Sequence, residues 1–548
     1  MRIPFKYTSS CLLVLCAAVC FPQAASPANA AIPSGGACQR LAGLNLPHAA
    51  VTMATEVAAG AFNAPPDPFS GQSAAAFYKK LPAFCRVVVH SHPSADSDIP
   101  IEVWMPLEGW NGKLLGDGNG GFAGSIGYED LGAAITQGYA AAGTDTGHSA
   151  SFIDASWALE HPEKVADFGY RGIHEMTVTA KAVVEQFNGA GAKHSYFASC
   201  SDGGREALME AQRFPEDYDG ILAGAPANNW TALLATAAVD TLALTATPGS
   251  YIPPAKVPTI ANAVLAECDA LDGVKDGILN DPRKCRFDPA AIECKAGEDS
   301  NACLTAAQVT ALKALYAGPH NAKGRAAFPG YLPGAEEGQN GWGTWIFGPA
   351  PGRSLMAMFG TGYFSDMVYD NAKWDMKTFT LEKGLKDARE KTAAALDAVN
   401  PDLSAFEARG GKLILYHGWN DPAISALNTV NYYNGVAAKL GRSATKSFVR
   451  LYMIPGMQHC AGGPGADMIG QSLLWPAQDA EHNVRIALED WVEKGTAPDT
   501  LTATKTAGDS PEGAATMTRL LCPYPKEAAY NGGDPNRAES FTCKGPGK

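Results

Sequence analysis

The sequence predicts an α/β protein whose parallel sheet is interrupted by a large insert. Short apolar runs of strand type alternate with helical patterns from residue 84 to about residue 228, and the alternation resumes after residue 404. One serine, Ser201, stands between such a run and a helical segment in "YFASCSDGGREALMEAQRFP", residues 196–215. A chain of 548 residues is long enough for two or more domains.

The first 30 residues have the composition of an export leader. Arg2 and Lys6 precede the apolar run "CLLVLCAAVC", and Ala28 and Ala30 form an A-x-A cleavage site. That run is too short to cross a bilayer, and no later stretch is long enough. We therefore expect residues 1–30 to be removed and the protein to be exported, to the periplasm or the medium.

The strand-like runs of the core are rich in β-branched and aromatic residues and are bounded by turn residues. They cover residues 84–93, 99–107, 138–148, 194–199, 411–422 and 446–460. Helical patterns cover residues 171–189, 204–214 and 482–495. The run at Leu114 and Leu115 passes into a loop that is too rich in glycine for the interior of an element. Because strands that alternate with helices form parallel sheets, we expect one with helices on both faces.

Residues 229–404 break the alternation and predict an inserted domain. The core is then divided into residues 31–228 and residues 405–548. The insert holds several turn clusters, four cysteines and an aromatic-rich segment, residues 341–374.

Charge and cysteine content narrow the partners and the compartment. The formal net charge of −13 argues against nucleic acid, because phosphate binding needs basic patches. Three of the 13 cysteines lie in the leader, and the even number that remains predicts disulfides in an exported chain. Spacing does not fix the pairs, but it suggests four and leaves a fifth: Cys38 with Cys85, Cys268 with Cys285, Cys294 with Cys303, Cys522 with Cys543, and Cys200 with Cys460.

The turn at Ser201 has the features of a nucleophile elbow, in which a tight strand-to-helix turn exposes a serine hydroxyl above the sheet. Small residues must flank that serine, and Ser199 and Gly203 stand two residues before and after it. The backbone N–H of Asp202, at the helix start, would face a developing oxyanion. Ser201 is equally suited to cap the helix, so the motif alone leaves a catalytic and a structural role open.

A base and an acid for this serine stand at the ends of two later strand-like runs. Asp421 lies just beyond "KLILYHG" and His459 just beyond "FVRLYMIPG", in the order serine, acid, histidine of α/β hydrolases. His417 is a rival base, but it lies within the loop of Asp421. The agreement of three positions favours a catalytic triad.

The cysteines beside the serine and the histidine support the same arrangement. If Ser201 and His459 meet within hydrogen-bond reach, Cys200 and Cys460 come within disulfide distance. Such a bond would hold the base in register with the serine. The alternative is a pair of free buried thiols, which does not suit an exported chain.

Several motifs along the chain point to one family. They are C-S-x-G-G-R at residues 200–205, H-G-W-x-D-P at 417–422, H-C at 459–460, "WNGKLLGDGNGGFAG", "GTDTGH" and "FPEDYDGILAGAP". In these motifs the chain resembles the tannase/feruloyl esterase family of α/β hydrolases. The resemblance implies an α/β-hydrolase fold with a large inserted lid domain, rich in disulfides. It also implies a disulfide between the neighbours of the catalytic serine and histidine.

The resemblance assigns roles to single residues. It implies the nucleophile Ser201, the base His459, the orienting acid Asp421, and oxyanion donors at the N–H of Asp202 and of Gly120 or Gly121. Members of the family usually carry glycine where this chain has Ser199. The added hydroxymethyl group is expected to shift the elbow slightly.

The acidic loop "CDALDGVKDGILNDPRKC" offers oxygen ligands to a hard cation. Its carboxylates repel one another unless a cation neutralises them; the alternative is a solvated acidic turn. The resemblance implies a structural Ca²⁺ at this loop. The implied ligands are the side chains of Asp269, Asp272 and Asp276 and the carbonyls of Val274 and Ile278.

The aromatic-rich segment is expected to cover the active site as a lid. Its rings could stack on an aromatic acyl group, although most of them would form the core of the lid itself. They are Trp342, Trp345, Phe359, Tyr363, Phe364, Tyr369 and Trp374. Relatives that cleave terephthalate monoesters hold the free carboxylate with a lid arginine, and Arg353 is the single arginine of this segment.

We therefore expect an exported serine esterase that cleaves small esters of aromatic, hydroxycinnamate-like acids through an acyl-enzyme, without an organic cofactor. Plant cell walls or polyphenols would supply such esters. Tannase activity on gallate esters and hydrolysis of terephthalate monoesters are alternatives within the family. A serine peptidase of the same fold and a catalytically dead aromatic- or glycan-binding protein are the alternatives outside it.

Overall fold

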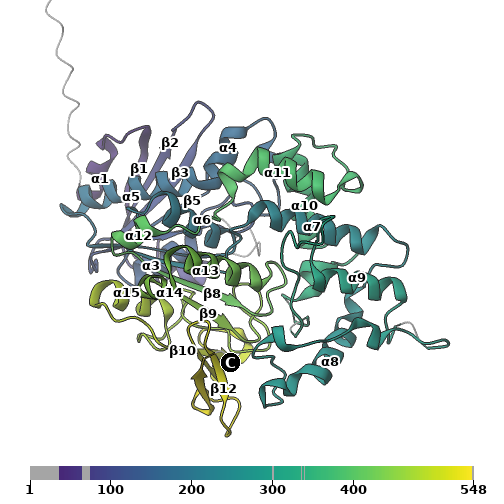
Figure 1. Cartoon of the computed structure of the whole chain (residues 1–548). Coiled ribbons are helices and arrows are strands. Elements are labelled where there is room, and N and C mark those ends of the chain that lie inside the picture. Colours follow the sequence, from purple (N-terminus) through teal and green to yellow (C-terminus); the bar gives the residue numbers. More distant parts are fainter. Residues whose placement is uncertain (1–35, 65–73, 299–300, 335, 339, 546–548) are drawn as a thin grey trace, which may run out of the picture.

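A nine-stranded sheet forms the centre of the computed structural model, which describes residues 36–64, 74–298, 301–334, 336–338 and 340–545 (Figure 1). The expected leader, residues 1–30, lies outside the described residues. The strands lie in the order β1-β2-β3-β5-β4-β6-β7-β8-β9. They are β1 (Ala49–Val57), β2 (Phe84–Ser91), β3 (Ile99–Pro106), β4 (Lys113–Asp117), β5 (Ala140–Thr144), β6 (His194–Cys200), β7 (Gly220–Gly224), β8 (Lys412–Gly418) and β9 (Val449–Ile454).

The sheet is mixed, which corrects the expectation of a parallel one. From β5 to β9 every neighbouring pair is parallel, but β1, β2, β3 and β5 pair antiparallel. The short link between β2 and β3 explains the antiparallel pairing of these two strands, because a parallel pair needs a crossover of a dozen residues or more. The expected loop after Leu115 is also shorter than predicted, since β4 continues to Asp117.

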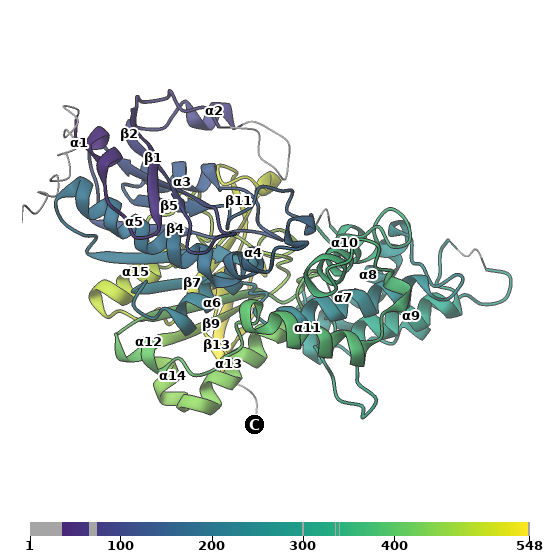
Figure 2. The same cartoon turned by 90° about the horizontal axis from the view of Figure 1, so that it is seen from above.

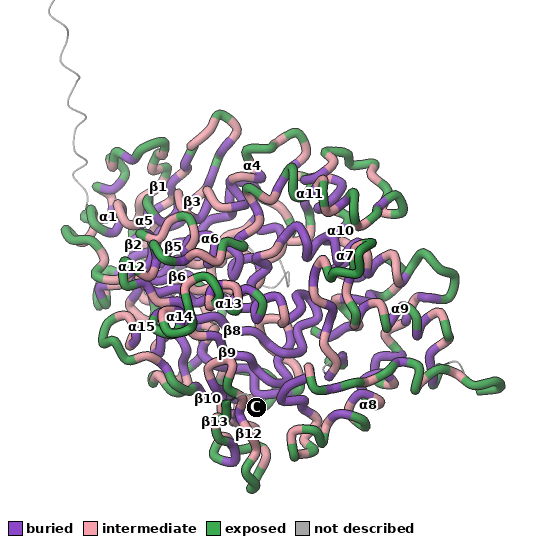
Figure 3. The backbone as a smooth tube through the Cα atoms, viewed as in Figure 1, coloured by how far each residue is buried: buried purple, intermediate pink, exposed green. Residues whose placement is uncertain are grey.

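Helices cover both faces of the sheet, as the alternation predicts. The long ones are α3 (Tyr128–Thr136), α5 (Gly172–Asn188), α6 (Asp202–Arg213), α13 (Ala426–Leu440) and α15 (Val484–Lys494), and the short ones are α1 (Ala37–Arg40), α2 (Ala75–Tyr78), α4 (Pro162–Ala166) and α14 (Arg442–Phe448). One apolar cluster joins α5, α6 and α13 to the sheet, and a second joins α3 and α15 to its other face. Figure 3 shows the central strands of the sheet mostly in the colour of buried residues.

The segment between β7 and β8 contributes its own helices beside the sheet (Figure 2). They are α7 (Trp230–Thr245), α8 (Val257–Cys268), α9 (Ala306–Ala317), α10 (Leu355–Gly362) and α11 (Leu381–Leu396), followed by α12 (Ser404–Ala408). Two further apolar clusters lie within this segment and its contacts with the core. The domain limits at residues 229 and 404 stay a prediction.

Two small hairpins end the chain. They are β10 (Leu501–Thr506) with β11 (Ala515–Leu521), and β12 (Glu527–Tyr530) with β13 (Phe541–Lys544). Among the described residues, no helix is long and apolar enough to cross a membrane. All five disulfides expected from the spacing are present: Cys38–Cys85, Cys200–Cys460, Cys268–Cys285, Cys294–Cys303 and Cys522–Cys543.

Candidate active site

Ser201 occupies a strained turn between β6 and α6. Its φ of 68° and ψ of −120° place it in a conformation that residues other than glycine rarely adopt. The turn is fixed to β7, because the Ser201 N–H donates to the carbonyl of Gly224 at 3.0 Å. A side chain at Gly204 would lie only 2.3 Å from that same carbonyl oxygen. The small residues after the serine therefore allow the close approach that an elbow needs.

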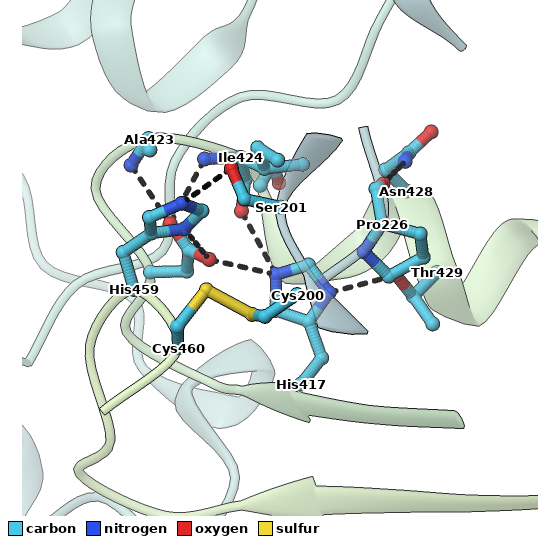
Figure 4. A network of polar contacts seen from close by, with 12 residues as sticks. Cys200, Ser201, Pro226, His417, Ala423, Ile424, Asn428, Thr429, His459 and Cys460 are labelled. Carbon is cyan, nitrogen blue, oxygen red and sulfur yellow. Dashed lines mark hydrogen bonds and ion pairs between the residues drawn. A yellow bond between two sulfur atoms is a disulfide. The ribbon is translucent and has the colours of Figure 1, made fainter. Parts of the chain in front are cut away.

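His459 and Asp421 meet Ser201 beyond the ends of β8 and β9. Figure 4 shows His459 beside Ser201. The Ser201 hydroxyl lies 2.9 Å from Nε2 of His459, and Nδ1 of His459 lies 2.7 Å from Oδ2 of Asp421. The hydroxyl donates to Nε2, and Nδ1–H donates to the carboxylate. The three residues predicted from strand ends are thus in one hydrogen-bonded chain, in the geometry of a nucleophile, a base and its orienting acid.

The disulfide Cys200–Cys460 joins the two sides of this chain (Figure 4). It connects the residue before the serine to the residue after the histidine, with their Cα atoms 6.0 Å apart. Cys460 has a φ of 62°, so the backbone beside His459 is held in an uncommon conformation. The bond therefore links the end of β6 covalently to the loop after β9.

Asp421 is a fully buried carboxylate that four donors hold in its ionised form. Oδ1 accepts the N–H of Ala423 at 2.8 Å and that of Ile424 at 2.9 Å, while Oδ2 faces His459 and, at 3.1 Å, Nε2 of His417. Burial raises the pKa of Asp421, but the charge of His459 and the hydrogen bonds from both histidines lower it well below its usual range. The rival base His417 therefore contacts the acid, whereas His459 contacts the serine.

The expected oxyanion donors line the same cavity as Ser201. Asp202 is the first residue of α6, and Gly120 and Gly121 follow β4. Asn119 joins these two elements, because its carbonyl accepts the N–H of Gly203 at 2.7 Å. The loop after β4 and the start of α6 therefore hold a fixed relation to the serine.

Two buried acidic residues, Glu206 and Asp202, lie beside the contact between Asn119 and α6. Oε2 of Glu206 accepts the N–H of Asn119 at 2.9 Å. Burial and then the charge of Asp202 raise the pKa of Glu206 to about 8. Burial raises the pKa of Asp202 to about 6, against the opposing charge of Arg205, whose Nε donates to it at 2.6 Å. The burial of these two carboxylates could not be predicted from the sequence, because acidic residues at helical spacing usually form a solvated face.

The cavity above Ser201 has a volume of about 370 Å³ and is mainly apolar. The insert supplies most of the large apolar side chains of its wall, from α7, α10 and the π-helical turn Gly343–Phe347. The ring of Trp345 lies edge-on to His459, with 5.0 Å between the ring centroids, and parallel to Phe359. The apolar side chains of the wall are Phe152, Trp230, Leu233, Leu234, Trp345, Leu355, Met356, Phe359 and Ile424.

The comparison with known families decides the identity of this site. The family described as "Tannase and feruloyl esterase" matches residues 85–544. This chain belongs to the tannase and feruloyl esterase family.

Relatives of the family member described here cover nearly all of the chain. An uncharacterised esterase from Xanthomonas campestris is 40% identical and covers 93% of this chain and 91% of its own. A probable feruloyl esterase B from Aspergillus clavatus is 35% identical, over 82% and 84% of the two chains. The crystal structure of feruloyl esterase B from Aspergillus oryzae superposes with a TM-score of 0.83 at 31% identity, over 93% and 99%. Tannin acyl hydrolase from Aspergillus niger shares the fold, with a TM-score of 0.71 at 23% identity, over 91% and 92%.

Ser199, two residues before the serine of the triad, packs against Gly203. A Cβ atom at Gly203 would lie only 1.9 Å from Oγ of Ser199. The extra hydroxymethyl group therefore takes the space that the missing side chain of Gly203 leaves. The adjacent Ser201 still reaches His459.

The lid aromatics lie in three different places in this family member. Trp345 and Phe359 line the cavity, whereas Trp342 lies in a separate buried cluster. Four others pack on one another away from the cavity: Tyr363, Phe364, Tyr369 and Trp374. Arg353 is exposed and does not line the cavity, so it cannot hold a substrate carboxylate there.

Backbone N–H groups donate hydrogen bonds to the carboxylates of the acidic loop. Asp269 accepts the N–H of Gly277, and Asp272 accepts those of Val274 and Asn280. Asp276 pairs with the buried Arg519 at 2.5 Å. The three carboxylates are not all within 4.8 Å of one another in this structure.

Another cluster does bring three such groups within 4.8 Å: His174, Glu210 and Asp217. Nδ1 of His174 lies 2.6 Å from Asp217, and the ammonium of Lys181 lies 3.9 Å from the same carboxylate. Burial, followed by the charge of Asp217, raises the pKa of Glu210 well above its usual range. The cluster is formed by α5, α6 and the residues after α6, and none of its three members lines the cavity of Ser201.

Proposed function

We propose that this protein is an exported serine esterase that hydrolyses esters of hydroxycinnamate-like aromatic acids through an acyl-enzyme on Ser201. Membership of the tannase and feruloyl esterase family makes it a carboxylic ester hydrolase. The observation that supports the proposal most is a Ser–His–Asp chain that opens into an aromatic-lined cavity.

The geometry supports the following reaction. Oγ of Ser201 attacks the ester carbonyl while its proton passes to Nε2 of His459. The N–H groups of Asp202 and of Gly120 or Gly121 stabilise the oxyanion, and ionised Asp421 stabilises the imidazolium. His459 then gives the proton to the leaving alcohol as its C–O bond breaks. Water repeats the sequence on the acyl-enzyme, releases the acid and restores the serine.

The lining of the cavity supports neutral, weakly hydroxylated acyl groups. Among the residues that the structure describes, no lysine or arginine lines the cavity, and its polar side chains besides the triad and Asp202 are Asn340 and Thr344. A gallate ring carries three hydroxyls that need partners when they are buried, and a terephthalate monoester carries a carboxylate that needs a cation. A methoxylated cinnamate buries more apolar surface for each polar group.

A panel of three substrates tests this preference: methyl ferulate, methyl gallate and monohydroxyethyl terephthalate. We expect the highest kcat/KM for methyl ferulate. A higher kcat/KM for methyl gallate or for monohydroxyethyl terephthalate would show that the proposed acyl class is wrong. Hydrolysis of peptides in place of all three esters would favour a peptidase.

Export is a further part of the proposal. The ten cysteines outside the predicted leader pair in five disulfides, and such frameworks persist in oxidising compartments. Expression of the full chain and N-terminal sequencing of the mature form tests it. We expect the mature chain to begin near residue 31; retention of residues 1–30 would contradict export by this leader.

A structural Ca²⁺ at the acidic loop is also proposed. Among the described residues, the oxygens of Asp269 and Asp272 accept hydrogen bonds only from backbone N–H groups, and neither carboxylate forms an ion pair with a lysine or arginine. Oxygen donors of this kind suit Ca²⁺. The ligands would be the side chains of Asp269, Asp272 and Asp276 and the carbonyls of Val274 and Ile278. The ion would order the loop and take no part in the chemistry.

A further inference from the structure

A second histidine contacts the acid of the triad. His417 belongs to β8 and is completely buried. Its Nε2 lies 3.1 Å from Oδ2 of Asp421 and 3.1 Å from the carbonyl oxygen of Ile424. Its Nδ1 lies 2.7 Å from the hydroxyl of Thr429 in α13 (Figure 4). Both ring nitrogens of a buried imidazole are thus hydrogen-bonded.

The surroundings of His417 decide which nitrogen carries a proton. A carbonyl oxygen and an ionised carboxylate can only accept hydrogen bonds, and both face Nε2. Nε2 therefore carries a hydrogen and donates it. The hydroxyl of Thr429 can donate to Nδ1 or accept from it, so this conclusion holds for the neutral and for the cationic ring.

One oxygen of Asp421 is shared by two imidazoles. Oδ2 accepts from Nδ1 of His459 at 2.7 Å and from Nε2 of His417 at 3.1 Å. Oδ1 is held separately by the backbone N–H groups of the same loop. Without His417, only Oδ1 and the catalytic histidine itself would fix the plane of the carboxylate. His417 therefore holds Oδ2 of Asp421 in position without depending on His459, which is the side chain that Oδ2 orients.

We infer that His417 is a positioning residue of the triad, which acts through Asp421 by donating its Nε2–H to Oδ2. This inference rests on the proposed function of Ser201, His459 and Asp421. His417 does not line the substrate cavity. Its loss should therefore slow the chemical step and leave substrate binding almost unchanged.

Two amide substitutions separate this role from simple packing. The amide of glutamine reaches the place of Nε2, whereas the shorter asparagine reaches only the place of Nδ1. We expect His417→Asn to lower kcat about 10- to 100-fold, as loss of a hydrogen bond to a charged group does, with KM within about twofold. We expect His417→Gln to keep kcat within about fivefold of the parent.

Thr429→Val is the matched control, because it removes the partner of Nδ1 and leaves the bond to Asp421 in place. Its kcat should stay within about threefold of the parent. Melting temperatures of all variants identify those that fail to fold, and only folded variants are compared. An unchanged kcat in His417→Asn, or an equal fall in all three variants, would overturn the inference.

p-Nitrophenyl acetate, a small activated ester, separates this test from the proposed function. A parent chain that cleaves it but not methyl ferulate contradicts the acyl class only, and the variants are then compared on the acetate. A parent chain that cleaves no ester contradicts the proposed function itself. A parent that is active while His417→Asn keeps full kcat contradicts the positioning role alone.

Discussion

Oγ of Ser201 lies 2.9 Å from Nε2 of His459, although 258 positions separate the two residues in the chain. The serine belongs to the turn after β6 and the histidine to the loop after β9, with β7 and β8 between them in the sheet. The contact therefore depends on how the turn after β6 and the loop after β9 are held relative to each other. The disulfide between Cys200 and Cys460 fixes them, since it joins the immediate neighbours of both residues.

Removal of this disulfide should impair both stability and catalysis. The bond links residues 260 positions apart, and in the chain-entropy model the loss of a cross-link that closes so long a loop lowers the free energy of unfolding by about 5–6 kcal/mol. We expect the double variant Cys200→Ala/Cys460→Ala to unfold more easily and to lose at least about tenfold in kcat, because small displacements of catalytic groups slow reactions. Denaturant unfolding and steady-state kinetics measure the two effects.

The pair Cys294 and Cys303 provides the control, because it lies in the insert and closes a loop of only 9 positions. Its double alanine variant should keep the parent kcat. Equal kcat in both double variants would mean that the bond beside Ser201 has no role in aligning the site.

Glu206 should make the protein less stable as the pH rises. Its pKa is raised from 4.5 to about 8 in the folded chain, mainly by burial and then by the charge of Asp202. Between these values the folded state keeps a proton that the unfolded state releases, so the free energy of unfolding falls with increasing pH. Glu206→Gln removes this dependence and can still accept the N–H of Asn119.

Melting temperatures at pH 5 and pH 8 check this prediction. Relative to the parent, Glu206→Gln should gain about 2–4 °C between the two pH values. The exposed Glu185→Gln on α5 is the control and should gain nothing. A relative gain that is absent, or that has the opposite sign, would show that Glu206 is ionised in the folded protein.

Trp345 should contribute to the binding of aromatic acyl groups. Its ring lines the cavity and packs edge-on against His459. We expect Trp345→Ala to raise KM for methyl ferulate about tenfold, because an aromatic contact and its buried area are lost. The effect on p-nitrophenyl acetate should be much smaller.

Trp374 is the control for this variant, since it packs on Phe364 and Tyr369 in the interior of the lid. Trp374→Ala should lower the melting temperature and leave KM close to that of the parent. A larger change in KM for Trp374→Ala than for Trp345→Ala would show that Trp345 is not the ring that contacts the substrate.

Removal of calcium should destabilise the insert without a direct effect on the chemistry. A ligand that binds only the folded state stabilises it, so a chelator should lower the melting temperature of the parent. Asp272→Asn should melt at the lower temperature with or without the chelator. Asp288→Asn, which changes an exposed aspartate elsewhere in the insert, should respond as the parent does. Metal analysis that finds no Ca²⁺ in the purified parent would exclude the site.

The triad was predictable because each of its members follows a strand with a recognisable pattern. Ser201, Asp421 and His459 stand at the ends of apolar runs, and ends of parallel strands meet at one edge of a sheet. Spacing suggested four of the five disulfides, and the fifth, between Cys200 and Cys460, was expected from the meeting of Ser201 and His459. The strand β7 was not predicted, because Gly220–Gly224 is too short and too rich in glycine to show a period.

The wall of the cavity could not be predicted, because it depends on how the insert packs. Trp342 and Trp345 are three positions apart in one turn, yet the first is buried in another cluster and the second contacts His459. Arg353 lies in the lid segment but faces solvent. His417 was visible as a rival base, and only the distances show that it serves the acid.

Covalent labelling of the serine tests the central claim most directly. The parent and Ser201→Ala are treated with diethyl p-nitrophenyl phosphate, and the adduct is located by mass spectrometry of peptides; Ser199→Gly serves as a serine control. We predict one phosphoryl adduct per chain, on the peptide that contains Ser201, in the parent and in Ser199→Gly. Ser201→Ala should carry no adduct and should lose at least about 10⁴-fold in kcat. An adduct on another residue, or normal turnover by Ser201→Ala, would contradict the account.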